Sequence, residues 1–445
     1  MRCGSSTQLR TAFYFLRKIL TKDQNDQPKL NNMKITSLTL WLFIGLTMIT
    51  LTNCGQTSAT NTSAQTGTNQ VDIPELLPRP KALQDATEWE RTQSGYMKLS
   101  SDLRLKNANA VEPRVTLAQI FVNEARVTGE HGHYYPAALK MVDQALNINK
   151  GLDQNLEFLA LSTKASVQLS QHDFASALET AKRAIRINPH NAQIYGALVD
   201  ANVELGNYDA AVEASDQMVS IRPDLRSYSR VSYLREIYGD VDGAIEAMEM
   251  AVKAGYPGYE STAWARLTLG EIHQRYGNKE AARKQYETIL KERPNYPFAI
   301  AALGDLALAA KDYPKAEKLL KEAAGIIPEV GYYMSLAKLY KATGRQEEMR
   351  SAEEEIFVML QDDVDSGHNM DLEYASFYRD QFEDYDKAME YTRREYEKRP
   401  RNIDVNRLIA ALMQEKDMKK EAQPYLEVAA STNSRHPELT EMMAR

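Results

Sequence analysis

An alanine recurs at a nearly constant spacing along most of this 445-residue chain. Successive copies of the position lie 39, 34, 33, 38, 34, 33, 39 and 34 residues apart, and eight of the nine are alanine. The nine positions are Ala138, Ala177, Ala211, Ala244, Ala282, Ala316, Met349, Ala388 and Ala422. A period of about 20–50 residues indicates a repeat architecture, in which each unit buries the apolar face of its neighbour. The chain should therefore fold as a stack of similar units.

The units share two further features. Seven residues after each of these positions stand Ala145, Ala184, Met218, Ala251, Ile289, Ala323, Ile356, Glu395 and Ala429. Near the end of most units stands a proline, at Pro189, Pro223, Pro257, Pro294, Pro328 and Pro400. Proline stops a helix, so we expect each of these residues to end the second helix of its unit.

Each unit should be a pair of antiparallel helices. Small residues such as Gly270, Gly304 and Ala337 on the first helix, and the recurring alanines on the second, let the two helices pack closely. Turns such as GNYD (206–209) and KDYP (311–314) join the helices, and their tyrosines should fill the hinge. One apolar face of each pair stays open until the next pair covers it, so the units stack into a solenoid.

Two segments carry a family resemblance. ALGDLALAAKDYPKAEKLLKEAAGIIP (302–328) and LGEIHQRYGNKEAARKQYETILKERP (269–294) resemble tetratricopeptide repeats. The resemblance implies an all-α, right-handed superhelical solenoid of about nine antiparallel helix pairs over 81–436, with an N-terminal capping helix around 82–105 and a C-terminal tail at 437–445. The pairs are expected at about 117–150, 157–190, 191–224, 225–258, 263–296, 297–330, 331–361, 369–402 and 403–436.

The N-terminal region has the pattern of a secreted lipoprotein. Met33 and Lys34 precede the apolar run ITSLTLWLFIGLTMITL, which fits a signal peptide at 33–53. The run ends at LTNC, which resembles a bacterial lipobox and implies lipidation of Cys54 after cleavage, although Asn53 is larger than the residue usual there. A retained signal anchor and a free thiol are the alternatives.

The segments on either side of the signal have simpler interpretations. Residues 1–32 are expected to be an over-long N-terminal extension with the start at Met33, or else a separate basic leader around TAFYFLRKIL. Residues 54–80 should be a flexible tether, since GQTSATNTSAQTGTNQ has no large apolar residue. The cysteines are Cys3 and Cys54, so the processed chain cannot form an internal disulfide.

Charge and motifs exclude several classes of function. The formal net charge is −7, and the basic first 53 residues leave about −12 on the other 392, which disfavours nucleic-acid binding. The sequence has no HExxH, GxSxG, P-loop or Rossmann glycine pattern. We therefore predict a protein that is not an enzyme and holds no cofactor and no metal.

Two local motifs merit separate consideration. In GEHGHYYP (129–136), an enlarged inter-helix loop, His131, His133 and Tyr134 could contact a partner; a zinc site there lacks a distant fourth ligand. DDVDSGHNMDLE (362–373) has Gly and Glu at the sixth and twelfth positions of an EF-hand loop, but Val364 and Met370 occupy ligand positions. A widened linker, with Asn369 or Asp371 capping the next helix, is the preferred interpretation.

The first helices of the pairs should line a concave groove. The expected lining residues are Asp200, Glu204, Arg226, Tyr233, Trp264, Glu271, Arg275, Asp305, Lys338 and Phe377. Mixed charges with scattered aromatic residues suit an extended peptide or a helix. Gly196 and Asp200 stand where repeats that clamp a C-terminal carboxylate carry Lys and Asn, so that activity is disfavoured.

Together these features predict a membrane-anchored scaffold that binds other proteins in the cell envelope, at the outer membrane. By resemblance, tetratricopeptide lipoproteins of diderm bacteria assist envelope assembly, pilus and secretion machines, or cell-wall enzymes. The alternatives are a SusD-like glycan- or nutrient-binding lipoprotein, in which Trp264 would contact sugar, and a cytosolic scaffold. The partner, the side of the membrane and the oligomeric state stay open.

Overall fold

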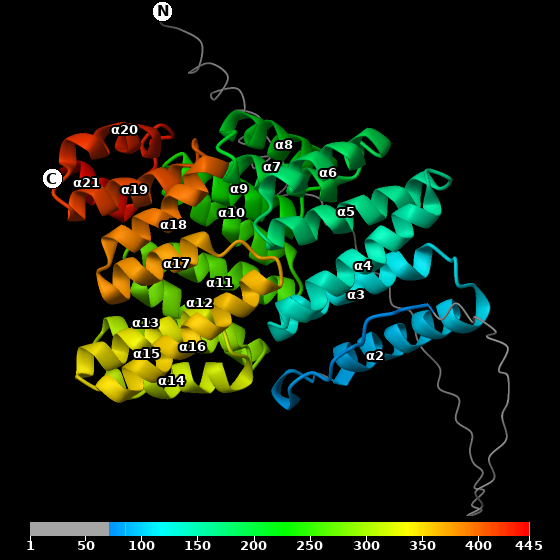
Figure 1. The fold of residues 1–445 in the computed structure, drawn as a ribbon, viewed down its shortest axis with the longest axis horizontal. Helices are drawn as coiled ribbons and strands as arrows, with labels where there is room; N and C mark the ends of the chain where they lie inside the picture. Colours follow the sequence, from blue (N-terminus) through cyan, green and yellow to red (C-terminus); the bar gives the residue numbers. More distant parts are fainter. Residues whose placement is uncertain (1–70, 85, 445) are drawn as a thin grey trace, which may run out of the picture. The chain divides into compact units, whose positions relative to one another are not determined.

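The computed structural model describes residues 71–84 and 86–444, and this part of the chain is helical without any β-strand (Figure 1). The expectations for Cys54, the signal peptide and residues 1–32 lie outside the described residues. The helices are α2 (Ala86–Ser101), α3 (Glu112–Thr128), α4 (His131–Asn149), α5 (Gln154–Ser170), α6 (Phe174–Ile187), α7 (Ala192–Glu204), α8 (Tyr208–Ile221), α9 (Leu225–Ile237), α10 (Val241–Ala254), α11 (Glu260–Arg275), α12 (Lys279–Glu292), α13 (Pro297–Ala309), α14 (Tyr313–Ile326), α15 (Val330–Thr343), α16 (Gln346–Asp365), α17 (Asp371–Phe377), α18 (Tyr385–Lys398), α19 (Ile403–Glu415), α20 (Lys419–Ala429) and α21 (Pro437–Ala444). Three short segments complete them: a 3₁₀ turn at Lys81–Leu83 and π-helical segments at Asp102–Lys106 and Tyr378–Phe382.

The expected helix pairs are confirmed in the described residues. They run from α3 with α4 to α19 with α20, and α2 precedes them as the expected front helix. The first pair begins at Glu112, about five residues before its expected start, because Pro113 suits the first turn of a helix. The predicted all-α, right-handed solenoid of about nine pairs is therefore the observed fold.

The recurring alanines lie where the two helices of a pair meet. All eight, from Ala138 to Ala422, have no exposed surface. The facing glycines are equally constrained: a Cβ on Gly270 would lie 2.3 Å from Cε1 of Tyr286, and one on Gly304 would lie 3.0 Å from Cγ of Leu320. Close helix packing therefore accounts for the small residues in both registers.

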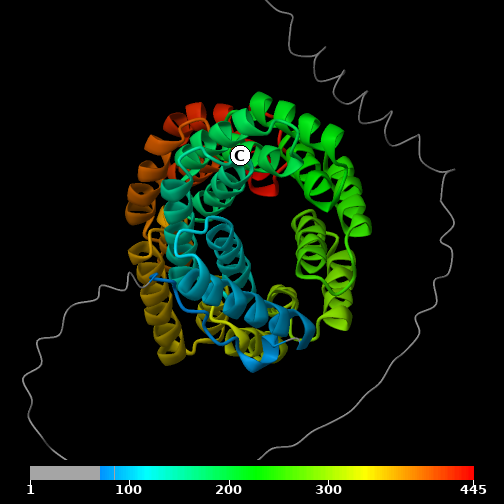
Figure 2. The same cartoon turned by 90° about the vertical axis from the view of Figure 1, so that its right-hand side faces the viewer.

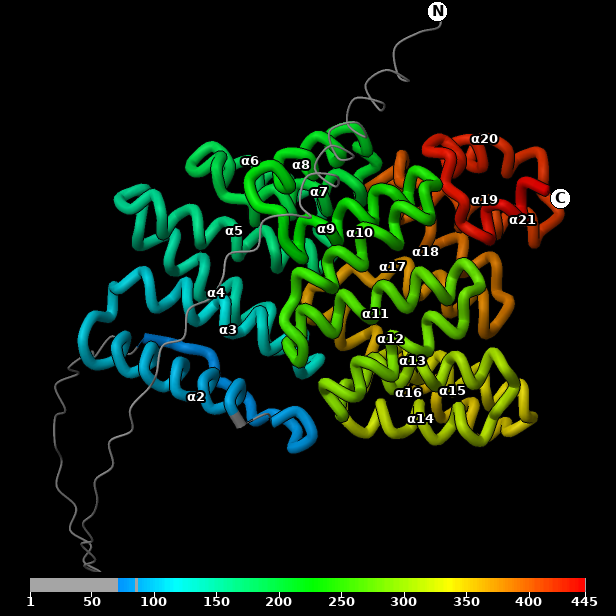
Figure 3. Tube along the Cα trace, turned by 180° about the vertical axis from the view of Figure 1, so that it is seen from behind, coloured from blue at the N-terminus to red at the C-terminus, as the bar shows by residue number. Residues whose placement is uncertain are grey.

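The pairs wind around an axis, and the chain meets itself after one turn (Figure 2). Contacts between the two turns join residues 194–198 positions apart, so one turn takes about that length of chain. In Figures 1 and 3, α18 to α20 lie beside α7 to α9. The backbone N–H of Ile403 donates to the hydroxyl of Tyr208 at 2.8 Å, which fixes α19 against α8.

Residues 71–80 belong to this packed body, so the tether prediction does not hold for them. Ile73 is 8 % exposed within the core around α3 and α4. Arg79 is 2 % exposed and pairs with the buried Glu124 through Nε and Nη2, both at 2.7 Å. The apolar and basic residues of DIPELLPRP (72–80) form these contacts, whereas GQTSATNTSAQTGTNQ before it has no large apolar residue.

The C-terminal segment, expected as a tail at 437–445, includes a helix. Pro437 begins α21, and Leu439 and Met442 are buried against the core of α18 to α20. Their spacing of three residues puts both side chains on one helix face.

Candidate interaction surface

The expected groove residues lie, as predicted, on the first helices of successive pairs. Asp200 and Glu204 are on α7, Arg226 and Tyr233 on α9, and Trp264, Glu271 and Arg275 on α11, followed by Asp305 on α13, Lys338 on α15 and Phe377 on α17. The structure divides these ten residues into an exposed group, a group engaged with its neighbours, and two that are placed differently from the expectation.

A side chain on α3 influences the pKa values of side chains on α9 and α11, two of the helices that carry these residues. Partial desolvation lowers the pKa of Arg226 on α9, and the guanidinium of Arg126 on α3 lowers it further. Desolvation raises the pKa of Glu260 on α11, and the same guanidinium opposes that rise. One side chain on α3 thus acts on residues of both α9 and α11. Figure 2 shows the helix pairs arranged in a ring.

Helix α11 presents the most accessible part of this face. Trp264 follows Glu260 by one helical turn, and Glu271 follows Trp264 by two, so the three share a side of the helix. Trp264 is 44 % exposed, and Glu271 and Arg275 are also exposed. Arg275 pairs with Glu236 on α9, and loss of solvent raises the pKa of Glu271. The surface is an exposed indole among charged groups.

Other expected residues are held by adjacent repeats. Arg230 donates to the carboxylate of Asp200 through Nε at 3.0 Å and Nη2 at 2.6 Å. Tyr233 is half-buried against the core of α5 to α9. Burial raises the pKa of Asp305, and the ammonium of Lys338 partly opposes this. Asp200, Tyr233 and Asp305 are partly buried, whereas Lys338 is exposed.

Phe377 does not line the surface, which corrects the sequence expectation. Its side chain is 2 % exposed, and its ring centroid lies 5.3 Å from that of Phe357 on α16. Helix α17 is only seven residues long and is followed directly by the π-helical segment Tyr378–Phe382. A π-helical segment shifts the helical register. Phe377 occupies the position that we expected to face the groove, but with this shift its side chain lies in the core.

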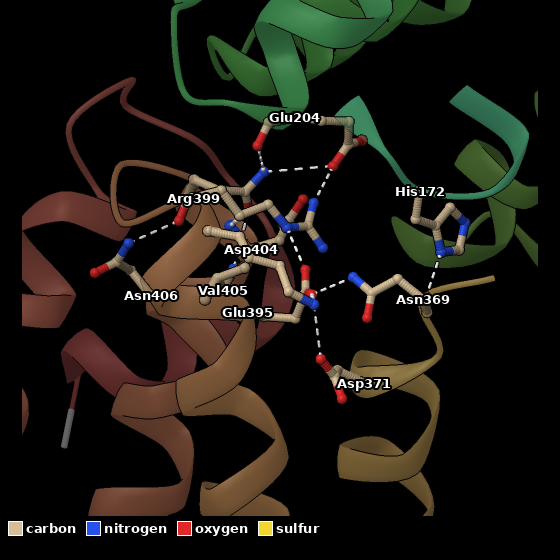
Figure 4. Close-up of polar contacts among 11 residues, drawn as sticks. His172, Glu204, Asn369, Asp371, Glu395, Arg399, Asp404, Val405 and Asn406 are labelled. Atoms are coloured by element: carbon tan, nitrogen blue, oxygen red, sulfur yellow. Dashed lines mark hydrogen bonds and ion pairs between the residues drawn. The ribbon is translucent and has the colours of Figure 1, made fainter. Parts of the chain in front are cut away.

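Glu204 is also placed differently, because its carboxylate accepts from Arg399 of the following superhelical turn (Figure 4). We name the contact region there the inter-turn seam. It comprises Gln171, His172, Glu204, Asn207 and Tyr208 of one turn, and Ser366, Asn369, Glu395, Arg399, Arg401, Asn402 and Ile403 of the next. Sequence reasoning did not foresee it.

The seam surrounds a buried carboxylate. Glu395 is 1 % exposed and occupies the position that is apolar in the other units. Arg399 donates to it at 2.6 Å through Nε, Lys398 donates at 3.0 Å, and the amide of Asn369 also donates. Burial alone would raise the pKa of Glu395, but Arg399, Asn369 and Lys398 hold it below its usual value. The charged residue in an apolar register was the available signal for this site.

Backbone contacts complete the seam. The N–H of Asn369 donates to the carbonyl of Gln171 at 3.1 Å, and Nδ1 of His172 donates to the carbonyl of Asn369 at 2.9 Å. Asn369 therefore does not cap α17, and neither does Asp371, because the helix begins at Asp371 without a side-chain cap. The linker is used for contact between turns instead.

The structure separates the three residues of the motif at 129–136. Only Gly129 and Glu130 form the turn, because α4 begins at His131, so the loop is not enlarged. Tyr134 is fully buried and accepts from the N–H of Leu77 at 3.1 Å, and Nε2 of His133 lies 2.8 Å from the carbonyl of Glu75. Both hold residues 71–80 in place, whereas His131 faces α16 of the next turn.

Antiparallel helix pairs that stack around an axis define a superhelical repeat protein. Two family models described as tetratricopeptide repeat match residues 168–235 and 267–330. This chain is therefore a protein that contains tetratricopeptide repeats.

Several known proteins share parts of this arrangement. Anaphase-promoting complex subunit 7 of Arabidopsis thaliana is 26 % identical over 187 residues, which take in 42 % of this chain and 32 % of that relative. The match to a chain in the structure of the APC/C hetero-tetramer Cut9–Hcn1 covers 82 % of this chain and 61 % of that chain, with a TM-score of 0.44 and 14 % identity. The match to PilF of Pseudomonas aeruginosa covers 46 % of this chain and 93 % of the PilF chain, with a TM-score of 0.38 and 14 % identity. Likenesses of this size do not identify a partner.

Proposed function

We propose that this protein is a membrane-anchored scaffold without catalytic activity, whose inner surface binds peptide or helical segments of other proteins. The observation that carries the proposal is that Trp264 is 44 % exposed on α11, with the exposed Glu271 and Arg275 on the same helix. Exposed tryptophan and arginine side chains are the residues that most often anchor a protein interface. Rigid repeats hold them in place, so a partner loses little free energy to ordering of the surface.

The anchoring part of the proposal is supported by the sequence. The apolar run ends at LTNC, which includes Cys54. A lipid on Cys54 would hold the repeats at the outer membrane of the cell envelope and raise the local concentration of envelope partners. The proposed partners are proteins, since the acidic body disfavours nucleic acid.

Site-specific photo-crosslinking tests the binding surface. A photoreactive amino acid at position 264, in the full chain in its native membrane, should give a discrete crosslinked protein. The matched control is position 256, where Tyr256 is 76 % exposed on the α10–α11 connection, outside the helices that carry the proposed surface. Equal crosslinking from both positions, or saccharide binding that is lost in Trp264→Ala, would refute a protein-binding role for this surface.

Metabolic labelling tests the anchor. Labelled palmitate should enter the chain, and Cys54→Ala should abolish both the label and membrane association. A Cys54→Ala protein that stays in the membrane would show an uncleaved signal anchor, and a chain that takes up no label would favour a scaffold without a lipid.

A further inference from the structure

Two motifs that lie more than 230 residues apart in the sequence meet beside the inter-turn seam. His131 begins α4, and Asp363 and His368 lie at and just beyond the end of α16. Each of the three offers one potential ligand atom, and these atoms all lie within 4.8 Å of one another. Neither motif alone has enough ligands for a metal site. The superhelical turn brings His131 of the first motif close to Asp363 and His368 of the second.

His368 has the hydrogen bonding of a metal ligand. Its ring is 7 % exposed, and Nδ1 lies 3.2 Å from the backbone carbonyl of Asp363. A carbonyl only accepts, so Nδ1 must carry the proton and Nε2 must present a lone pair. Nε2 has no hydrogen-bond partner within the described structure. Metal-bound histidines commonly donate their other N–H to a backbone carbonyl in this way.

His131 is held in position beside it. Its ring stacks on Tyr135 with centroids 5.2 Å apart and an interplanar angle of 17°, and lies 6.0 Å from the ring of His368. The stacking on Tyr135 thus holds the imidazole of His131 beside that of His368.

The surroundings favour a cation. A pocket of about 420 Å³ is lined by His131 and Asp363 together with Glu130, Glu329 and Asp362. Several carboxylates thus meet at a site with two imidazoles, and a divalent ion would offset the repulsion among them.

We propose that His131, Asp363 and His368 form a binding site for a divalent transition metal of the zinc type, which links two turns of the superhelix. Imidazole and carboxylate ligands suit zinc, whereas calcium and magnesium prefer oxygen ligands alone. Tetrahedral zinc with bonds of about 2.1 Å places its ligands about 3.4 Å apart, so the side chains must approach by roughly 1 Å. Water can supply the fourth ligand, because the site opens into the pocket.

Calorimetric titration of the full chain with ZnCl₂ tests the site, after treatment with EDTA and with no histidine tag. One zinc should bind per chain with micromolar or tighter affinity, and His131→Gln, Asp363→Asn and His368→Ala should each weaken binding at least tenfold. His190→Ala is the matched control, because His190 is exposed on the α6–α7 connection and should leave the affinity unchanged.

Two further measurements separate metal binding from folding. Far-ultraviolet circular dichroism should show equal helicity for all four variants without metal. Cobalt(II) should give the visible absorption of a tetrahedral site in the parent chain and in His190→Ala, and not in His131→Gln. Absence of saturable zinc binding, or equal affinity in the parent and in folded His368→Ala and Asp363→Asn, would overturn the proposal.

Discussion

Glu204 and Arg399 form an ion pair although they lie 195 residues apart in the chain. Arg399 also binds Glu395 at 2.6 Å, and its guanidinium lies 4.9 Å from the ring of Phe174. One arginine thus contacts α6, α7 and α18, which belong to two successive turns of the superhelix. Figure 4 shows its contacts with Glu204 and Glu395. This side chain therefore joins the two turns through its three contacts.

Replacement of Arg399 by methionine should destabilise the fold strongly. The change leaves the buried carboxylate of Glu395 without its main partner, and removing one member of a buried pair costs about 3–5 kcal/mol. Urea unfolding followed by circular dichroism measures this loss. Lys182→Ala is the control, since its pair with Glu179 is exposed on α6 and should contribute under about 1 kcal/mol.

The double variant Arg399→Met with Glu395→Ala should recover part of that loss. Alanine restores the apolar register at this position and removes the uncompensated charge. A double variant that is less stable than Arg399→Met would contradict this account of the seam.

Gly270→Ala should destabilise a single helix pair. Its new Cβ would lie 2.3 Å from the ring of Tyr286, and overpacking of this kind costs about 1–3 kcal/mol. Gly325→Ala on α14 is the matched control, because nothing lies within 4 Å of its new Cβ, and alanine there should add up to about 1 kcal/mol of stability. Thermal unfolding of both variants measures the difference, and equal melting temperatures would argue against close packing at Gly270.

Gly206→Ala should open the contact between turns. Gly206 has φ 73°, and a Cβ there would lie 2.5 Å from the backbone carbon of Arg401 in the next turn. Gly344 has the same φ, but no atom lies within 4 Å of a Cβ built there. Gly344→Ala should therefore lose only about 1 kcal/mol of stability, from the strain of a left-handed backbone. Small-angle X-ray scattering should show a larger radius of gyration for Gly206→Ala alone; equal radii would contradict the prediction.

Stability should fall as the solution is acidified through the range of His436. Burial and the guanidinium of Arg407 lower its pKa to about 4, while Asp404 and Glu438 oppose this and Arg275 on α11 adds to it. The unfolded state has a pKa near 6.5, so it binds the proton first, and stability present above that pH is lost between about 6.5 and 4.

Urea midpoints at pH 7.5 and 5 measure this dependence. In His436→Gln the difference between the two pH values should be smaller than in the parent chain, while His190→Gln should match the parent because His190 is exposed. Because His131 titrates in the same direction, part of the dependence should remain in His436→Gln. An unchanged difference in His436→Gln would exclude its role.

The local part of the fold could be predicted from the sequence, because it depends on residues close together in the chain. The alanine register and the helix-ending prolines specify each pair without reference to distant units. The inter-turn seam could not be predicted in this way. It depends on small rotations between successive pairs, which add up over about 195 residues and leave no periodic signal.

The candidate site was predictable to the same extent. Trp264 is exposed on α11, the first helix of its pair, as the repeat register predicts. Phe377 does not line the surface, because a π-helical segment follows it directly. No residue pattern in the sequence predicted that segment. The proximity of His131 to His368 required the full superhelical turn, so the two motifs appeared unrelated in the sequence.

The seam also determines how this solenoid responds to force. An array with contacts only between neighbours lengthens gradually under load, like a spring. When adjacent coils are joined, the same array resists extension until the joints fail and then lengthens abruptly. Tension between the two ends of the repeats would therefore be held first by Arg399 and its partners, and the chain would act as a stiff coupling up to a threshold.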